Sequence, residues 1–143
     1  MFHAQNCKTV TGLAPISLNS AAATALTVDT LGYAYAVATV QFGVIGGAAT
    51  VFKIQESESD FSGSNITAFT GSGTTGNLRL PQTSDAGLLF EYHVHLRKNR
   101  MRYLQFAITT GATTLVSVTW KLWRADQMPS SNTDLGLAAR VIG

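Results

Sequence analysis

The stretch YAYAVATVQFGVI, Tyr33 to Ile45, decides the fold class of this chain. Its residues alternate with period two, and residues i and i+2 share one face of an extended strand. One face carries Ala34, Ala36, Ala38, Val40, Phe42 and Val44, and the other carries Tyr33, Tyr35, Val37, Thr39 and Gln41. Because both faces are fairly apolar, we expect a central strand that is covered on both sides.

The next segment is expected to turn back at Gly46-Gly47, with these glycines supplying the positive φ angles of a hairpin. Thr50 to Gln55 then forms a return strand, with Phe52 and Ile54 inward. The uncharged stretch from Thr30 to Phe52 is long enough to span a bilayer. Its alternating polarity favours strand, turn and strand instead, so we expect no membrane segment.

The middle of the chain is rich in polar residues and glycine. Glu56 to Asn65 reads as an acidic, solvated loop, because serine and glycine separate its acidic residues. A short strand is expected at Ile66 to Thr70, followed by a loop at Gly71 to Gly76. This loop matches the glycine pattern of dinucleotide-binding turns, but the segment after it contains Pro81 and cannot form the required helix. We therefore expect no cofactor.

The C-terminal half contains three alternating segments, Leu88 to Leu96, Met101 to Thr109 and Leu115 to Trp123. Turns at Arg97 to Arg100 and at Gly111-Ala112 separate them, and this order predicts a three-stranded antiparallel meander. The side chains expected to point inward are Phe90, Tyr92, Val94, Leu96, Leu104, Phe106, Ile108, Val116, Val118, Trp120 and Leu122. Short strands separated by glycine-containing turns predict an all-β fold, an antiparallel β-sandwich or jelly roll.

The two ends of the chain lack the strand pattern of the middle. We divide the chain into one β-sandwich domain, residues 1–128, which includes an N-terminal arm, and an extended C-terminal arm, residues 129–143. Residues 1 to about 12 are either that arm or an edge strand. Terminal arms are often only frayed ends, but apolar residues in both ends would be poorly placed in water. The arms are therefore also candidates for contact with a neighbouring protein.

Composition excludes several classes of function. The chain has 143 residues, a net charge of +2 and only 13% charged residues, whereas about 25% is usual. Nucleic-acid binding needs a concentrated basic face, so we do not expect it. The single cysteine, Cys7, excludes a disulfide within the chain and is expected to be a small, semi-buried hydrophobic residue. The N-terminus shows no signal-peptide pattern.

The strongest enzyme-like pattern lies around His93 and His95. With Gly87 they match the start of the cupin metal motif, and alternate strand residues can share one metal ion. Glu91 is expected on the same face. The motif's glutamate is absent, however, since Asn99 and Arg100 occupy its place, and its second half is missing. We therefore expect no catalytic residues and keep a metal site of Glu91, His93 and His95 only as a minor alternative.

A basic run at the predicted hairpin tip contains Arg97, Lys98, Arg100 and Arg102. It is either a solvated turn or an electrostatic contact to an acidic surface of a partner. Together with the arms, it supplies our candidate partner-binding residues, which are Phe2, His3, Arg97, Lys98, Arg100, Arg102, Leu135, Leu137, Arg140, Val141 and Ile142.

The order of these features resembles the decoration or cement proteins of tailed bacteriophage heads. The likeness covers roughly residues 30 to 130. It rests on Tyr33 to Gly47 with the following VFKIQESESDFSG, on EYHVHLRKNRMRYLQFAITTG from Glu91 to Gly111, and on the closing strand Leu115 to Trp123 followed by Pro129. These are patterns rather than invariant signatures, and the tails match nothing in the family.

The resemblance implies a jelly-roll-like sandwich that is commonly a homotrimer. It further implies a virion protein made in the host cytoplasm and placed on the outer capsid surface, where it binds the major capsid protein and stabilises the head. Two alternatives remain open. One is a β module of the tail, neck or fibre that contacts the host or a glycan, for which Tyr33, Tyr35 and Trp123 are the available aromatic residues. The other is the cupin-like metal protein.

Overall fold

The computed structural model describes residues 7–23, 25–59, 67–68, 78–96 and 100–123. These residues form two antiparallel four-stranded sheets and one short 3-10 helix, η2. The strands and the helix are β1 (Cys7–Leu18), β2 (Val28–Asp29), β3 (Tyr35–Ile45), β4 (Val51–Ser57), β5 (Thr67–Ala68), η2 (Thr83–Asp85), β6 (Leu89–His95), β7 (Tyr103–Thr109) and β8 (Thr114–Trp123). The all-β prediction is confirmed.

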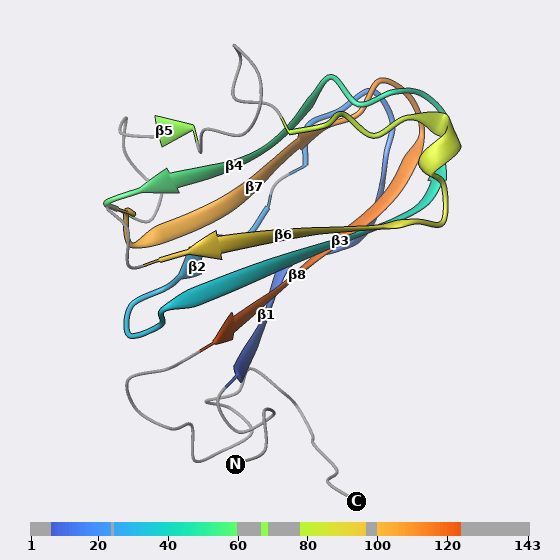
Figure 1. The fold of residues 1–143 in the computed structure, drawn as a ribbon. Helices are drawn as coiled ribbons and strands as arrows, with labels where there is room; N and C mark the ends of the chain where they lie inside the picture. The colour runs from blue at the N-terminus through green and yellow to red at the C-terminus, as the bar shows by residue number, and fades with distance from the viewer. Residues whose placement is uncertain (1–6, 24, 60–66, 69–77, 97–99, 124–143) are drawn as a thin grey trace, which may run out of the picture.

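The strand order is β1-β8-β3-β6 in one sheet and β2-β7-β4-β5 in the other. The two sheets form the two layers seen in Figure 1. Among the described strands, β4 and β5 are the only consecutive pair within one sheet, and every other connection crosses between the layers. Eight antiparallel strands wound between two sheets in this order make a jelly roll.

The predicted meander of the C-terminal half is wrong. β6 pairs with β3, β7 pairs with β2 and β4, and β8 pairs with β1 and β3. The segments predicted as neighbours therefore alternate between the sheets. An alternating pattern identifies the face that is buried, but this face is the same whichever sheet a strand joins.

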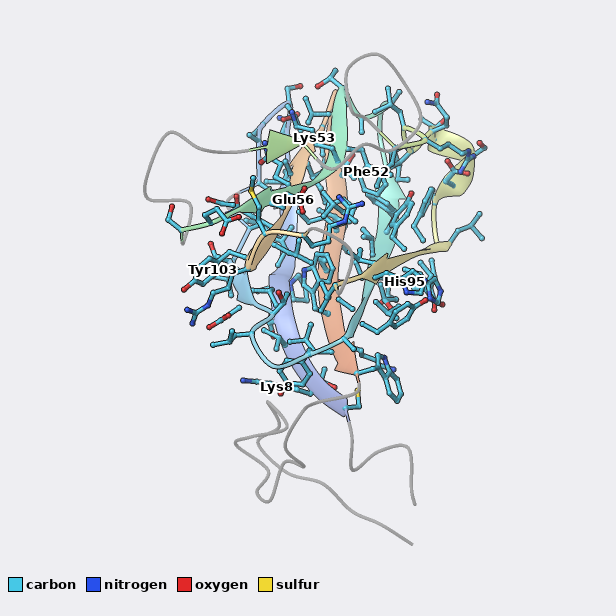
Figure 2. The ribbon with its side chains drawn as sticks, turned by 60° about the vertical axis from the view of Figure 1, so that its left-hand side comes forward. Lys8, Phe52, Lys53, Glu56, His95 and Tyr103 are labelled. Carbon is cyan, nitrogen blue, oxygen red and sulfur yellow. The ribbon has the colours of Figure 1, made fainter. Side chains whose placement is uncertain are left out.

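Most predicted inward-facing residues do form the core. Phe90, Val94 and the predicted inward residues of β7 and β8 are all buried, and Tyr92 and Leu96 pack against their edge. Phe42, Phe52, Phe90 and Phe106 form a cluster of rings with centroids 4.9 to 5.8 Å apart. Figure 2 shows the side chains of these strands gathered between the ribbons. The hydrophobic effect of this shared core holds the two sheets together.

The turn after β3 differs from the predicted hairpin. β3 and β4 belong to different sheets, so Gly46-Gly47 connects the layers. Positive φ angles occur among the described glycines at Gly32 and Gly87, not at this turn. The reason for glycine is space, because a Cβ at Gly46 would lie 2.7 Å from the carbonyl oxygen of Thr113.

Strand β3 also departs from its predicted alternation near its end. The register with β8 shifts between Phe42 and Ile45. This irregularity turns Val44 outward, where it is 68% exposed, and places Ile45 in the core at 5% exposed. An extra residue in one strand reverses the alternation beyond it. The other face of β3 is only partly covered, since Val37 is buried, Tyr35 is half-buried and Gln41 is exposed.

The ends of the sequence fall partly outside the described residues. Residues 7–12, expected as either arm or edge strand, belong to the edge strand β1. Cys7 is buried, as expected, and burial raises the pKa of its thiol. The predicted C-terminal arm, residues 129–143, lies outside the described residues. No helix in the described part of the chain has the length and hydrophobicity to cross a membrane.

Glu56 was expected in a solvated acidic loop, and that expectation is wrong. β4 extends to Ser57, and Glu56 is 6% exposed. Its carboxylate accepts hydrogen bonds from the Arg100 side chain and from the Met101 backbone N–H, each at 3.3 Å. The exposed acidic segment therefore starts only at Glu58.

Candidate functional site

The outer face of the β1-β8-β3-β6 sheet is the candidate site, because no other described strand or helix layers over it. Residues directly opposite in paired strands point to the same side of a sheet. The strand registers therefore align Cys7, Trp123, Tyr35 and His95 in one row across this face. The next row consists of Thr9, Lys121, Val37 and His93.

A polar cluster occupies the β6 side of this face. Tyr35 Oη lies 2.5 Å from His93 Nδ1, and His93 Nε2 lies 3.1 Å from Glu91 Oε1. The neutral imidazole with its proton on Nε2 satisfies both contacts, since it accepts from the tyrosine and donates to the carboxylate. The His95 ring packs edge-on against Tyr35, with centroids 4.8 Å apart. In Figure 2, His95 lies on the side of the molecule away from Glu56 and Tyr103.

The three candidate metal ligands therefore share a face, as their spacing predicted. Both ring nitrogens of His93 already have partners in Tyr35 and Glu91. The described residues contain no group of three or more His, Cys, Asp or Glu side chains arranged to hold a metal ion. A metal site of Glu91, His93 and His95 would have to break the two contacts of His93.

The other end of the same face is apolar. Leu89 is 63% exposed and Leu115 is 45% exposed, and the nearby Val44 also faces solvent. A hollow at this end includes Leu115, and its lining residues are Pro15, Gln41, Gly43, Leu115, Val116 and Ser117. Gly43 shapes this surface, because a Cβ there would lie 2.8 Å from Leu115 Cδ2. Exposed apolar side chains gathered at one end of a sheet face are candidates for protein contact.

Sequence reasoning did not find this apolar surface. Leu89 and Leu115 are the outward residues of segments whose inward residues were correctly assigned. An apolar residue at an outward position of the alternating pattern could therefore have indicated this surface. Val44 carried no such signal, because its exposure depends on the irregular register near the end of β3.

Two residues of the predicted basic run have partners within the chain. Arg102 donates to both carboxylate oxygens of Asp29, at 2.9 and 2.7 Å, and its guanidinium lies 4.9 Å from the ring centre of Tyr103. Arg100 pairs with Glu56 at 3.3 Å. These ion pairs were not foreseen, because they join residues far apart in the sequence. Contact of Arg100 and Arg102 with another protein stays a prediction.

The remaining predicted partner-binding residues lie outside the described residues. They are Phe2, His3, Arg97, Lys98, Leu135, Leu137, Arg140, Val141 and Ile142.

The structure places two of the three aromatic residues expected for a host-binding module side by side and the third elsewhere. Tyr35 and Trp123 are direct cross-strand neighbours on the outer face. Tyr33 packs against the core instead.

No known protein family model matches this chain, and no curated protein is detectably similar to it.

Proposed function

We propose that this chain is a structural virion protein that binds the outer surface of a tailed-phage head. In this role it bridges subunits of the major capsid protein and performs no catalysis. The sequence resemblance to head decoration proteins supports the proposal, and the jelly roll agrees with the fold that this resemblance implies. A jelly roll hosts many functions, so the argument depends on the surface.

The apolar end of the outer sheet face carries the proposal. Val44, Leu89 and Leu115 expose apolar side chains at this end of the sheet, and Leu115 also lines the hollow. Removing such side chains from water contributes about 25 cal/mol per Å² of apolar area. A protein surface that fills the hollow would therefore gain binding energy here without a change in the fold.

Bridging several coat subunits would stabilise a head through linked contacts. A contact of ordinary size buries about 1,600 Å² in total. When one molecule holds two subunits, separating them requires loss of a contact, and a second contact forms at high effective concentration once the first is made. Correctly spaced subunits are thereby favoured over a ruptured or distorted shell.

The test is co-sedimentation of the purified protein with heads of its own phage from which the protein has been stripped. We expect saturable binding at a fixed ratio to coat subunits, and greater resistance of the decorated heads to heat. A protein that stays at the top of the gradient while the heads sediment would contradict the proposal.

Two substitutions locate the binding surface. Leu89→Asp places a charge in the apolar end and is expected to weaken head binding at least tenfold. Leu31→Asp is the matched control, because Leu31 is 67% exposed in the turn that precedes β3. Equal binding by both variants would exclude the apolar end as the contact.

The adjacent Tyr35 and Trp123 favour a second candidate, a tail or fibre module that binds a glycan. Aromatic rings are suitable apolar surfaces with polar edges for such ligands. Binding to host-surface glycans that is lost in Tyr35→Ala, with no binding to stripped heads, would select this candidate.

A further inference from the structure

Strand β6 is an edge strand in the part of the chain that the structure describes. It is the last strand of the β1-β8-β3-β6 sheet, and among the described strands it pairs with β3 alone. The pairing runs from Tyr35 opposite His95 to Gln41 opposite Leu89 without a register shift. All seven residues of β6 are therefore regular, and the opposite side of the strand offers backbone groups in ladder geometry.

The hydrogen bonds at both ends of this ladder identify the backbone groups that face outward. Phe42 N–H donates to the Leu88 carbonyl at 3.3 Å, and Leu96 N–H donates to the Ala34 carbonyl at 3.0 Å. In an antiparallel pair, bonded and non-bonded residue pairs alternate. Even-numbered residues of β6 thus bond to β3. The N–H and C=O groups of the odd-numbered residues turn toward the open edge, and these residues are Leu89, Glu91, His93 and His95.

The opposite edge of the same sheet is protected in ways that β6 is not. β1 contains Lys8 and Pro15, and its register with β8 shifts twice, between Thr11 and Leu13 and between Leu13 and Ile16. Lysine, proline and bulges are the usual features that prevent unwanted strand pairing at a sheet edge. β6 contains neither lysine nor proline and has no bulge.

We propose that β6 pairs antiparallel with β6 of a second copy of this chain, around a two-fold axis at Tyr92. This register places Glu91 opposite the second copy's His93, and His93 opposite its Glu91. Leu89 of each copy likewise lies opposite His95 of the other copy. All four positions are the odd-numbered ones whose backbone groups point outward, so the ladder forms without loss of a bond to β3.

The side chains favour this register. Each Glu91 carboxylate, which contacts His93 of its own strand, lies opposite the His93 ring of the other copy, whereas like charges directly opposite each other across a ladder are destabilising. Shifting the axis to Glu91 would place two carboxylates face to face. Shifting it to His93 would still place Glu91 opposite an imidazole, that of His95, but would place the two His93 rings opposite each other. A symmetric interface presents the same patch twice, and of these three registers the one centred on Tyr92 places neither two carboxylates nor two imidazoles face to face.

Such a dimer would join the two outer faces into one surface. Directly opposite residues point to the same side, so the outer face of one copy continues into that of the other. The inference stands apart from the proposed head binding, because it concerns the isolated protein.

The experiment is sedimentation velocity of the full chain over a range of concentrations. We expect a species of twice the monomer mass. In Glu91→Pro the outward N–H is removed while the bonds to β3 remain, and proline is tolerated on an edge strand in this orientation. The dimer dissociation constant is expected to rise at least tenfold in this variant. Glu91→Gln is the matched control, since it keeps the N–H, and it should weaken the dimer less.

A charge exchange keeps the inference testable should Glu91→Pro fail to fold. His93→Glu places two carboxylates opposite each other and is expected to give a monomer. The double variant Glu91→His/His93→Glu restores both complementary pairs and should again form a dimer. A monomer at every concentration, a trimer, or a dimer that Glu91→Pro and His93→Glu both leave unchanged would overturn the inference.

Discussion

Gly12 determines how the largest buried side chain packs. Trp120 is fully buried, and a Cβ at Gly12 would lie 2.6 Å from its Cδ1 and 2.7 Å from its Nε1. The indole N–H has no hydrogen-bond partner among the residues that the structure describes. The indole ring thus lies directly on the backbone of β1, in space that any other residue at position 12 would need.

We expect Gly12→Ala to lower the free energy of unfolding by roughly 1–3 kcal/mol, the usual cost of inserting atoms into a packed core. Urea denaturation followed by Trp fluorescence measures the change. Thr11→Ala is the control, because Thr11 is exposed, and it should change stability by no more than about 0.5 kcal/mol. Equal stability of the Gly12 variant and the native protein would show that the ring moves aside freely.

Gly12 itself could not have been identified from the sequence. Its neighbours in β1 show no glycine motif, and the need for glycine comes from Trp120, which lies in the last strand. In contrast, the burial of Trp120 was predictable, because it depends on alternation within β8 alone. At the scale of single residues, properties set by the local pattern were predicted, and those set by distant contacts were not.

Near the end of β4, Glu56 holds the segment that precedes β7. The Glu56 side chain is 8% exposed and accepts from the Arg100 side chain and from Met101 N–H. Removing this acceptor takes away two hydrogen bonds, and a buried group that loses its partner costs more than the net gain of one bond.

We expect Glu56→Ala to destabilise the protein by roughly 1–3 kcal/mol. Glu58→Ala removes an exposed acid from the same run and should be nearly neutral. Hydrogen exchange of the Met101 amide gives a local measurement, with faster exchange in the Glu56 variant only. Unchanged exchange would mean that the carboxylate does not protect this N–H.

The predictions at the scale of elements succeeded for strands and failed for their connections. The periodic segments at Leu88, Met101 and Leu115 do contain strands, because two-residue alternation follows from the geometry of the strand itself. Their assignment to one meander failed, since pairing depends on which layer each strand joins. The sequence likewise predicted only part of the cluster on the outer face. It indicated that Glu91, His93 and His95 share a face, but not that Tyr35 joins them, because Tyr35 belongs to another strand.

Two carboxylates are expected to make the stability of the whole molecule depend on pH in the acid range. The hydrogen bond from Arg102 holds the pKa of Asp29 below its ordinary value, and the hydrogen bond from Arg79 does the same for Asp85. Asp29 attaches β2 to β7 through Arg102, and Asp85 lies in the connection that leads to β6. Protonation of Asp29 therefore weakens the contact between β2 and the residue before β7, and protonation of Asp85 weakens contacts within the connection to β6.

The direction of the pH effect follows from these shifts. A carboxyl with a lowered pKa in the folded state binds fewer protons than in the unfolded chain, so stability rises with pH across this interval. Its contribution is fully present well above the ordinary value of 3.8 and is lost as the pH falls through 3.8 to the lower folded pKa. We expect the urea concentration at the unfolding midpoint to decrease when the pH is lowered from 7 to 3. In Asp29→Asn/Asp85→Asn this fall should be smaller, because neither position titrates, whereas the control Glu58→Gln should keep the native fall. An equal fall in the double variant and the native protein would assign acid sensitivity to other carboxylates.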